Sequence, residues 1–139
     1  MELCASPRLS MSELARRVGM SAPAVTERVQ RLESAGVIAG YQVNLDPAKL
    51  GLPVTALVRI RPGPGQLPKI AELAQETPEV IECLRVTGED CFAIRVLAPS
   101  IEDLEQILDR FLLFGQTTTS IVVSAPVPAR RPPIPGGRS

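Results

Sequence analysis

Gln30 and Arg31 are neighbouring polar side chains of the kind that reads DNA bases. A glutamine amide can bond the edge of adenine, and an arginine guanidinium can bridge O6 and N7 of guanine. Ala24 and the methyl group of Thr26 could contact a thymine methyl. Small side chains at this point would let a helix approach the major groove closely. These four residues therefore indicate direct readout of double-stranded DNA.

Other residues nearby suit the DNA backbone. A helix that begins after Ser21 would offer its N-terminal N–H groups and dipole to a phosphate beside Ser21 and Ala22. Arg16, Arg17 and Arg28 are candidates for further phosphate contacts. Between Arg8 and Arg31 the sequence has five arginines against two glutamates, although the whole chain has 15 basic and 15 acidic residues. The excess of positive charge is therefore confined to this region and is not a property of the whole chain.

A helix is needed to place these side chains together. At 100° per residue, Val25, Val29 and Leu32 fall on one side. The opposite side carries Pro23, Glu27, Gln30, Arg31 and Ser34, flanked by Ala24 and Thr26. The same pattern also fits a plain amphipathic helix whose outer face meets water. The elements predicted on either side of this helix help to decide between these two interpretations.

Two short capped helices are predicted over residues 10–35. Ser10 and Glu13 have capping-box spacing, and Gly19 is a natural end for the first helix. Ser21 caps the second helix, and Gly36 ends it. The link is so short that the helices must cross steeply, as in a helix-turn-helix. The segment from Val37 to Leu45 has the composition of a strand.

The rest of the chain alternates strands and helices. Alternating Val54, Ala56, Val58 and Ile60 predict one face of a first strand. The remaining expected elements are a helix with a stripe of Leu67, Ile70, Leu73 and Ala74; strands Val80–Val86 and Cys91–Leu97; a helix capped by Ser100 that buries Ile101, Leu104, Ile107, Leu108, Phe111 and Leu112; and a strand Thr117–Ala125. This βαββαβ order predicts an α+β chain whose second domain is ferredoxin-like, with an antiparallel sheet and both helices on one face.

The other face of that sheet has no element to cover it. We expect Leu57 and Ile81 on this face, and an exposed apolar sheet face predicts a homo-oligomer. The expected domains are residues 1–45 (helix-turn-helix with a hinge strand), 46–52 (linker), 53–125 (ferredoxin-like) and a Pro-rich cationic tail, 126–139. The chain has no signal-peptide core and no convincing membrane span, so a cytoplasmic protein is expected.

Catalytic and metal chemistry is poorly represented. The sequence has no His, which excludes Ser-His-Asp and Cys-His catalysis and His-ligated zinc. Cys4, Cys83 and Cys91 lack metal or disulfide spacing and are expected to be reduced, with Cys83 and Cys91 buried and inert. Glu89-Asp90 is the acidic pair nearest a plausible pocket, and a solvated turn explains it better than a catalytic dyad. We therefore expect no enzyme, no metal and no cofactor.

Several stretches resemble one protein family. The stretch ELARRVGMSAPAVTERVQRLESAGVIAGYQVNLDPAKLG is similar to the DNA-binding half and hinge of the Lrp/AsnC (feast/famine) transcriptional regulators. PEVIECLRVTGEDCFAIRV resembles the middle of their effector domain, and TTTSIVVS resembles its last strand. The resemblance covers residues 3–125. It implies a winged helix-turn-helix, a ligand-sensing domain, dimers paired through their sheets and hinge strands, and further assembly into octamers.

The resemblance also implies a small-molecule effector, an amino acid or related metabolite, bound where dimers meet. The matching residues are the turn Thr87, Gly88, Glu89 and Asp90, followed by Cys91 and Phe92, with Thr118, Thr119 and Ser120 as further candidates. Backbone groups around Gly88 and the hydroxyls suit a zwitterion, and Glu89 and Asp90 could hold an ammonium group. These residues also fit an ordinary hairpin turn and surface strand.

Three departures from the family pattern shape our expectations. Only Met1–Ala5 stands where the family has a further helix, so we expect an incomplete helical core. Cys91 and Phe92 replace an acid and a phenol, which favours an apolar or aromatic amino acid over a cationic one. The Pro-rich tail has no counterpart. The leading interpretation is a DNA-binding regulator; the alternative is a ligand-binding or assembly subunit whose DNA-binding half does not work.

Overall fold

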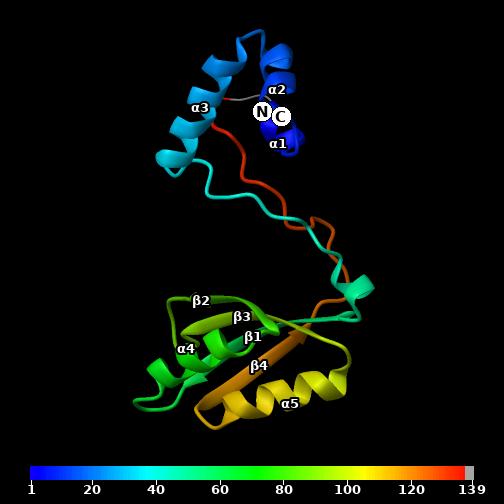
Figure 1. The fold of residues 1–139 in the computed structure, drawn as a ribbon. Helices are drawn as coiled ribbons and strands as arrows, with labels where there is room; N and C mark the ends of the chain where they lie inside the picture. Colours follow the sequence, from blue (N-terminus) through cyan, green and yellow to red (C-terminus); the bar gives the residue numbers. More distant parts are fainter. Residues whose placement is uncertain (137–139) are drawn as a thin grey trace. The chain divides into compact units, whose positions relative to one another are not determined.

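A computed structural model describes residues 1–136, and its contacts divide the chain into two compact units. One unit contains Met1–Asn44 together with residues 130–136, and the other is Leu45–Ala129 (Figure 1). The helices of the first unit are α1 (Glu2–Ala5), α2 (Met11–Val18) and α3 (Ala22–Ser34). The second unit contains a short 3-10 helix, η1 (Pro47–Leu50), and all the strands.

Local capping residues define α2 and α3 as predicted. The Ser10 hydroxyl accepts the Glu13 N–H, and the Ser21 hydroxyl accepts the Ala24 N–H. Gly19 follows α2 with φ +70°, a left-handed conformation that costs glycine little and stops the helix. The two helices bury a small core made of Leu14, Ala15, Val25 and Val29.

This helical core is incompletely closed, as predicted. Leu32 shares the side of α3 that carries Val25 and Val29, yet 42% of its surface is exposed. Val18, at the end of α2, is 45% exposed. Leu3 of α1, Leu9 and Ile38 pack around the four buried residues but do not cover these two side chains.

The predicted hinge strand over Val37–Leu45 is wrong for the isolated chain. This segment pairs with no strand, and Val37, Val43 and Leu45 are exposed. A strand needs a hydrogen-bonding partner, and the described sheet is complete without this segment. Instead, the Ile38 N–H donates to the Leu32 carbonyl, and the Tyr41 hydroxyl donates to Glu33 of α3 over 3.0 Å.

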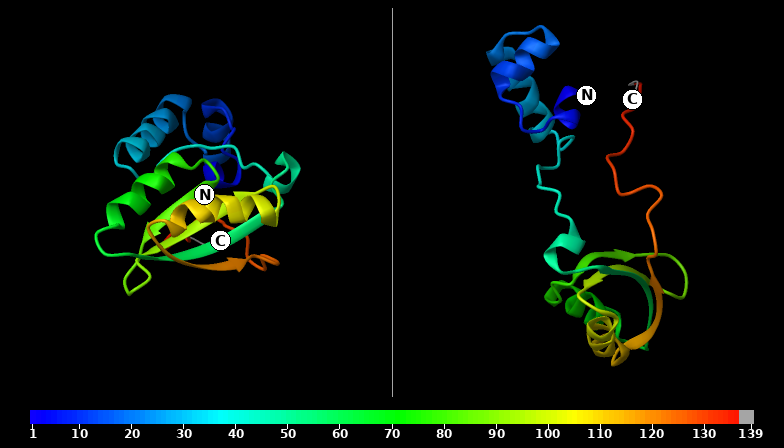
Figure 2. Two further views of the ribbon diagram at one scale, coloured as in Figure 1. Left: turned by 90° about the horizontal axis from the view of Figure 1, so that it is seen from below. Right: turned by 90° about the vertical axis from the view of Figure 1, so that its right-hand side faces the viewer.

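The second unit has the predicted ferredoxin-like topology. Its elements are β1 (Val54–Pro62), α4 (Leu67–Glu76), β2 (Val80–Arg85), β3 (Phe92–Ala98), α5 (Ile101–Leu112) and β4 (Gly115–Ile121). The antiparallel sheet has the order β2-β3-β1-β4. Within this unit α4 and α5 cover one sheet face (Figures 1 and 2). We call the other side the open face.

The strand alternation determines which side chains enter the core. Ala56, Val58 and Ile60 of β1 are buried against the helices together with Ile94 of β3 and Phe111 of α5. Burying this apolar surface provides the main stabilisation of the unit. The predicted buried face of α5 is correct at its centre but not at its ends, because Ile101 and Leu112 are about half exposed. These two residues are the first and last of the helix.

The last strand lies earlier than predicted. It spans Gly115–Ile121 instead of Thr117–Ala125. A side chain at Gly115 would overlap the backbone carbonyl of Arg61, so glycine permits the close approach of β4 to β1. After Ile121 only the Val122 N–H continues the ladder, by donating to Thr55. The tail residues 126–136 form no helix or strand, and Arg138 lies outside the described residues.

Candidate nucleic-acid interface and effector site

The outer face of α3 is polar and exposed. Val25 and Val29 face the core, whereas Pro23, Glu27, Gln30 and Arg31 are exposed. Thr26 is half-buried, and its hydroxyl donates to the Ala22 carbonyl over 2.9 Å. The helix therefore presents the predicted polar side chains on the side opposite its core.

The first turn of α3 offers fewer free donors than its position suggests. Pro23 has no N–H, Ala24 donates to the Ser21 hydroxyl, and Val25 donates to the Ser21 carbonyl. In the described part of the chain, the Ala22 N–H is thus the donor of this turn that has no acceptor. A phosphate at this helix end would meet that one backbone donor, with the hydroxyl hydrogen of Ser21 beside it.

Most arginines near α3 are already held by glutamates. Arg16 and Arg17 both bond the Glu13 carboxylate, over 2.7 and 3.2 Å, and Arg17 lies 3.7 Å from Glu2. The hydrogen bond from Arg16, with that from Arg17, lowers the pKa of Glu13 below its usual value. One turn along α3, Arg31 is paired with Glu27. Arg28, by contrast, forms no ion pair within residues 1–136.

The ion pairs in this region were not predicted from the sequence, although the spacing could have revealed them. Glu13 with Arg17 and Glu27 with Arg31 stand four residues apart on helices, a distance that brings side chains together. The hydrogen bond between Tyr41 and Glu33 joins residues eight positions apart, and no pattern in the sequence indicates it. Desolvation, followed by the bond to Glu33, raises the pKa of Tyr41.

The β2–β3 turn is tied to β1 by ion pairs. The Arg61 guanidinium lies 2.8 Å from Glu89 and 3.4 Å from Asp90, and Arg59 lies 3.9 Å from Asp90. The two acids were predicted to bind an ammonium group, but in the folded chain they pair with two guanidinium groups. Gly88 has φ +107°, so this turn requires glycine. Thr87 is exposed beside it.

The structure separates the other predicted effector residues. Phe92 is 1% exposed and lies in the core, where Arg85 stacks over its ring at 5.5 Å. Cys91 is half-buried, and its thiol lies 3.6 Å from the Gly88 and Glu89 carbonyls. On β4, Thr118 and Ser120 pair with Arg59 and Leu57 of the open face, whereas Thr119 pairs with buried Val58 and belongs to the opposite face.

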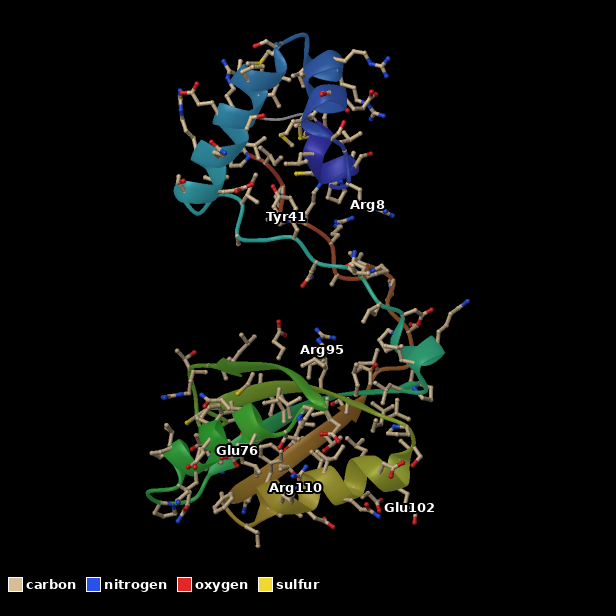
Figure 3. All side chains as sticks on the ribbon, viewed as in Figure 1. Arg8, Tyr41, Glu76, Arg95, Glu102 and Arg110 are labelled. Carbon is tan, nitrogen blue, oxygen red and sulfur yellow. The ribbon has the colours of Figure 1, made fainter. Side chains whose placement is uncertain are left out.

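The open face carries apolar and charged side chains together. Leu57 and Leu84 are 44% and 49% exposed and line one shallow hollow with Arg95, which lies 3.9 Å from Glu82. Arg95 projects from the side of the sheet away from the labelled residues of α4 and α5 (Figure 3). Ile81 was expected here, but it occupies a β-bulge and lines a different hollow beside α4. Leu84 is therefore the apolar neighbour of Leu57.

Cys83 and Cys91 are less buried than predicted. Cys4 and Cys83 are exposed, and Cys91 is half-buried; all three are free thiols. Desolvation raises the pKa of Cys83, which favours its unreactive protonated form. As predicted, the hairpin pairs Val86 with Cys91, not Cys83 with Cys91. The residues described contain no group of three or more potential metal ligands and no helix long and apolar enough to cross a membrane.

Comparison with known proteins agrees with this two-unit organisation. Residues 55–132 match the family model of the Lrp/AsnC ligand-binding domain, and residues 2–39 match a winged helix-turn-helix DNA-binding model. The chain belongs to the Lrp/AsnC family. This Lrp/AsnC protein therefore combines a helix-turn-helix unit with a ligand-binding domain of the ferredoxin-like topology described above.

Individual relatives match over most of their length. The HTH-type transcriptional regulator LrpC of Bacillus subtilis is 36% identical over 88% of this chain and 85% of its own, and its solved structure superposes with a TM-score of 0.84. LrpA of Mycobacterium tuberculosis is 39% identical over 78% of this chain and 73% of its own. A feast or famine regulatory protein of M. tuberculosis, solved in complex with L-methionine, is 34% identical, with a TM-score of 0.85 over 94% of this chain and 90% of its own.

Proposed function

We propose that this Lrp/AsnC regulator binds promoter DNA by placing α3 in the major groove. The observation that carries the proposal is the exposed polar face of α3, opposite Val25 and Val29, in a chain of this family. Gln30 and Arg31 would read base edges, with Ala24 and Thr26 against thymine methyl groups. Such a protein acts in the cytoplasm, on DNA, and needs no catalytic residue.

Specific binding and backbone binding can be separated by two arginine variants. Arg31→Ala should cost about 1–3 kcal/mol at a specific site and much less on random DNA, because a base contact is lost. Arg16→Ala should weaken binding to both DNAs alike and reduce the salt dependence, because a phosphate contact is lost. Fluorescence anisotropy with the gene's own upstream region and a random duplex measures both.

The same measurement tests the proposed function itself. If the wild-type chain binds its upstream region no better than random DNA at any salt concentration, sequence-specific binding is refuted, and the alternative of an assembly subunit with an inactive DNA-binding half takes its place. If both arginine variants lose equal affinity for both DNAs, the chain binds DNA but the assigned roles are wrong.

The open sheet face is proposed as a self-association surface. Leu57 and Leu84 expose apolar area beside the Arg95–Glu82 pair, so two copies related by a two-fold axis could bury the leucines and match opposite charges. Leu57→Glu should convert dimers or octamers to smaller species in light-scattering chromatography. Ile101→Glu, on an exposed α5 position, is the matched control and should leave the mass unchanged.

An amino acid is the proposed effector, bound around Thr87–Asp90 with Thr118 and Ser120 on the same sheet face. Support comes from the hydroxyl groups, the glycine turn and the L-methionine found in a related structure. Since Phe92 lies in the core, Cys91 alone remains to make this site less polar. A thermal-shift screen of the common amino acids should give apolar hits; stabilisation by lysine or arginine alone would refute this preference.

A further inference from the structure

The C-terminal tail is cationic, exposed and free of regular structure. Residues 126–139 contain five prolines, three arginines and no acidic residue. Arg130 and Arg131 lie in its described part and are exposed. Neither forms an ion pair with any acid of residues 1–136. The match to the ligand-binding family model extends to residue 132 and so includes both arginines, although the last strand of the sheet ends at Ile121.

The tail belongs with the helical unit. Although Arg130 follows the sheet domain in sequence, residues 130–136 group with Met1–Asn44. Residues 47–125, which include the whole sheet, have seven basic and ten acidic side chains, whereas residues 126–139 have three basic side chains and no acidic one.

The helical unit has little free positive charge of its own. Residues 1–44 contain five arginines and four glutamates. Three of those arginines, Arg16, Arg17 and Arg31, are held by glutamates. A guanidinium in an ion pair must release its carboxylate before it can neutralise a phosphate, so it contributes less than a free one. Arg130 and Arg131 thus supply as many unpaired guanidinium groups as Arg8 and Arg28 together.

We propose that Arg130 and Arg131 form a second DNA-contacting element that binds the phosphate backbone beside the site of α3. The partner is double-stranded DNA, and the contact carries no sequence information. The inference rests on the proposed function, because a tail of this kind strengthens binding that α3 directs.

The prolines make such an arm effective. Pro128, Pro132 and Pro133 restrict φ around the two arginines and favour an extended conformation. A segment that is already extended loses less conformational entropy when it lies along DNA. Because it is tethered to the protein that α3 anchors, the arm acts at a high effective concentration. It therefore adds affinity on every sequence without changing the preferred one.

The test is the salt dependence of DNA binding by the full chain. Arg130→Ala/Arg131→Ala should reduce the slope of log K against log salt by about 2, since each phosphate contact contributes about 0.9. Between about 50 and 200 mM salt, the fall in affinity should then be about tenfold smaller than for the wild type. The loss at low salt should be equal on the upstream region and on random DNA.

Two controls make the result specific. Arg130→Lys/Arg131→Lys keeps the charge and should keep the slope. Lys69→Ala/Arg110→Ala removes the same charge from exposed positions of α4 and α5 and should leave the slope unchanged. All these positions are exposed, so the variants should fold, which circular dichroism checks.

The outcomes separate this inference from the proposed function. If the wild type binds DNA and the double alanine variant keeps its slope, the arm does not contact DNA, and the Pro-rich segment must serve a protein partner or none. An equal effect of the Lys69/Arg110 variant would also overturn it, because net charge alone would be responsible. If the wild type binds no DNA, the proposed function fails and the inference fails with it.

Discussion

The Arg61 guanidinium on β1 lies 2.8 Å from the Glu89 carboxylate in the β2–β3 turn, although 28 positions separate the two residues. The same guanidinium reaches Asp90, and Arg59 approaches Asp90 as well. Two positive and two negative charges therefore lie together at the edge of the proposed effector site. Their sum is zero, so the turn does not attract a cation strongly, in agreement with an uncharged effector side chain.

Arg61→Gln should change which amino acids bind more than it changes stability. The ion pair is exposed, so its loss should cost at most about 1 kcal/mol of unfolding free energy. It leaves the turn with one excess negative charge, and lysine should then bind about threefold to fivefold more tightly than to the wild type. Isothermal titration with lysine and methionine measures this. Unchanged lysine affinity, or the same gain in Arg110→Gln, would contradict it.

Glu13→Gln should increase DNA affinity. At neutral pH the Glu13 carboxylate is charged, because Arg16 and Arg17 hold its pKa below the usual range. Removing that charge frees both guanidinium groups for phosphates, so affinity for any duplex should rise and the salt slope should steepen. The cost is a favourable charge in the first turn of α2, about 0.3–1 kcal/mol. Glu33→Gln, which makes the same change at the far end of α3, is the comparison variant. A salt slope that is smaller in Glu13→Gln than in the wild type would refute the idea.

Local patterns in the sequence were sufficient for much of this fold. Ser10, Ser21 and Ser100 cap their helices, because a serine hydroxyl at the N-cap accepts a hydrogen bond from the backbone N–H three residues later. The alternation of apolar residues identified the buried face of β1, because successive side chains of a strand point to opposite faces of the sheet. Family membership and the two-domain architecture were also predicted correctly, from the order of these elements and the resemblance.

Features that depend on distant partners were not predicted. Nothing near Glu89 in the sequence indicates Arg61, and only the β1–β3 register brings them together. The bulge in β2 redirects Ile81, and alternation along β4 separates Thr119 from Thr118 and Ser120. The Val37–Leu45 strand failed for the same reason, since strand composition does not provide a pairing partner.

Gly88→Val should abolish the effector response while leaving the oligomer intact. A Cβ at this position would meet no atom within 4 Å, so the cost comes only from the positive φ of +107°, about 1–2 kcal/mol. The turn should relax and move the groups proposed to bind the zwitterion. A ligand that raises the wild-type melting temperature should lose this effect in the variant. Gly65→Val, with φ +74° in the loop before α4, is the matched control. Equal stabilisation of wild type and Gly88→Val would place the ligand elsewhere.

The helical unit should be the first part of the chain to open. Its core has four buried residues, whereas the sheet domain buries a cluster of thirteen, and Val18 and Leu32 remain exposed beside the smaller core. Less buried apolar area provides less free energy against local unfolding. Amides of α3 should therefore exchange at least about tenfold faster than those of β3 in native-state hydrogen exchange. Bound DNA should slow exchange in α3 selectively, because a ligand stabilises the form that binds it. Protection in α3 equal to that in β3 without DNA would show that another surface, such as a neighbouring subunit, already covers Val18 and Leu32.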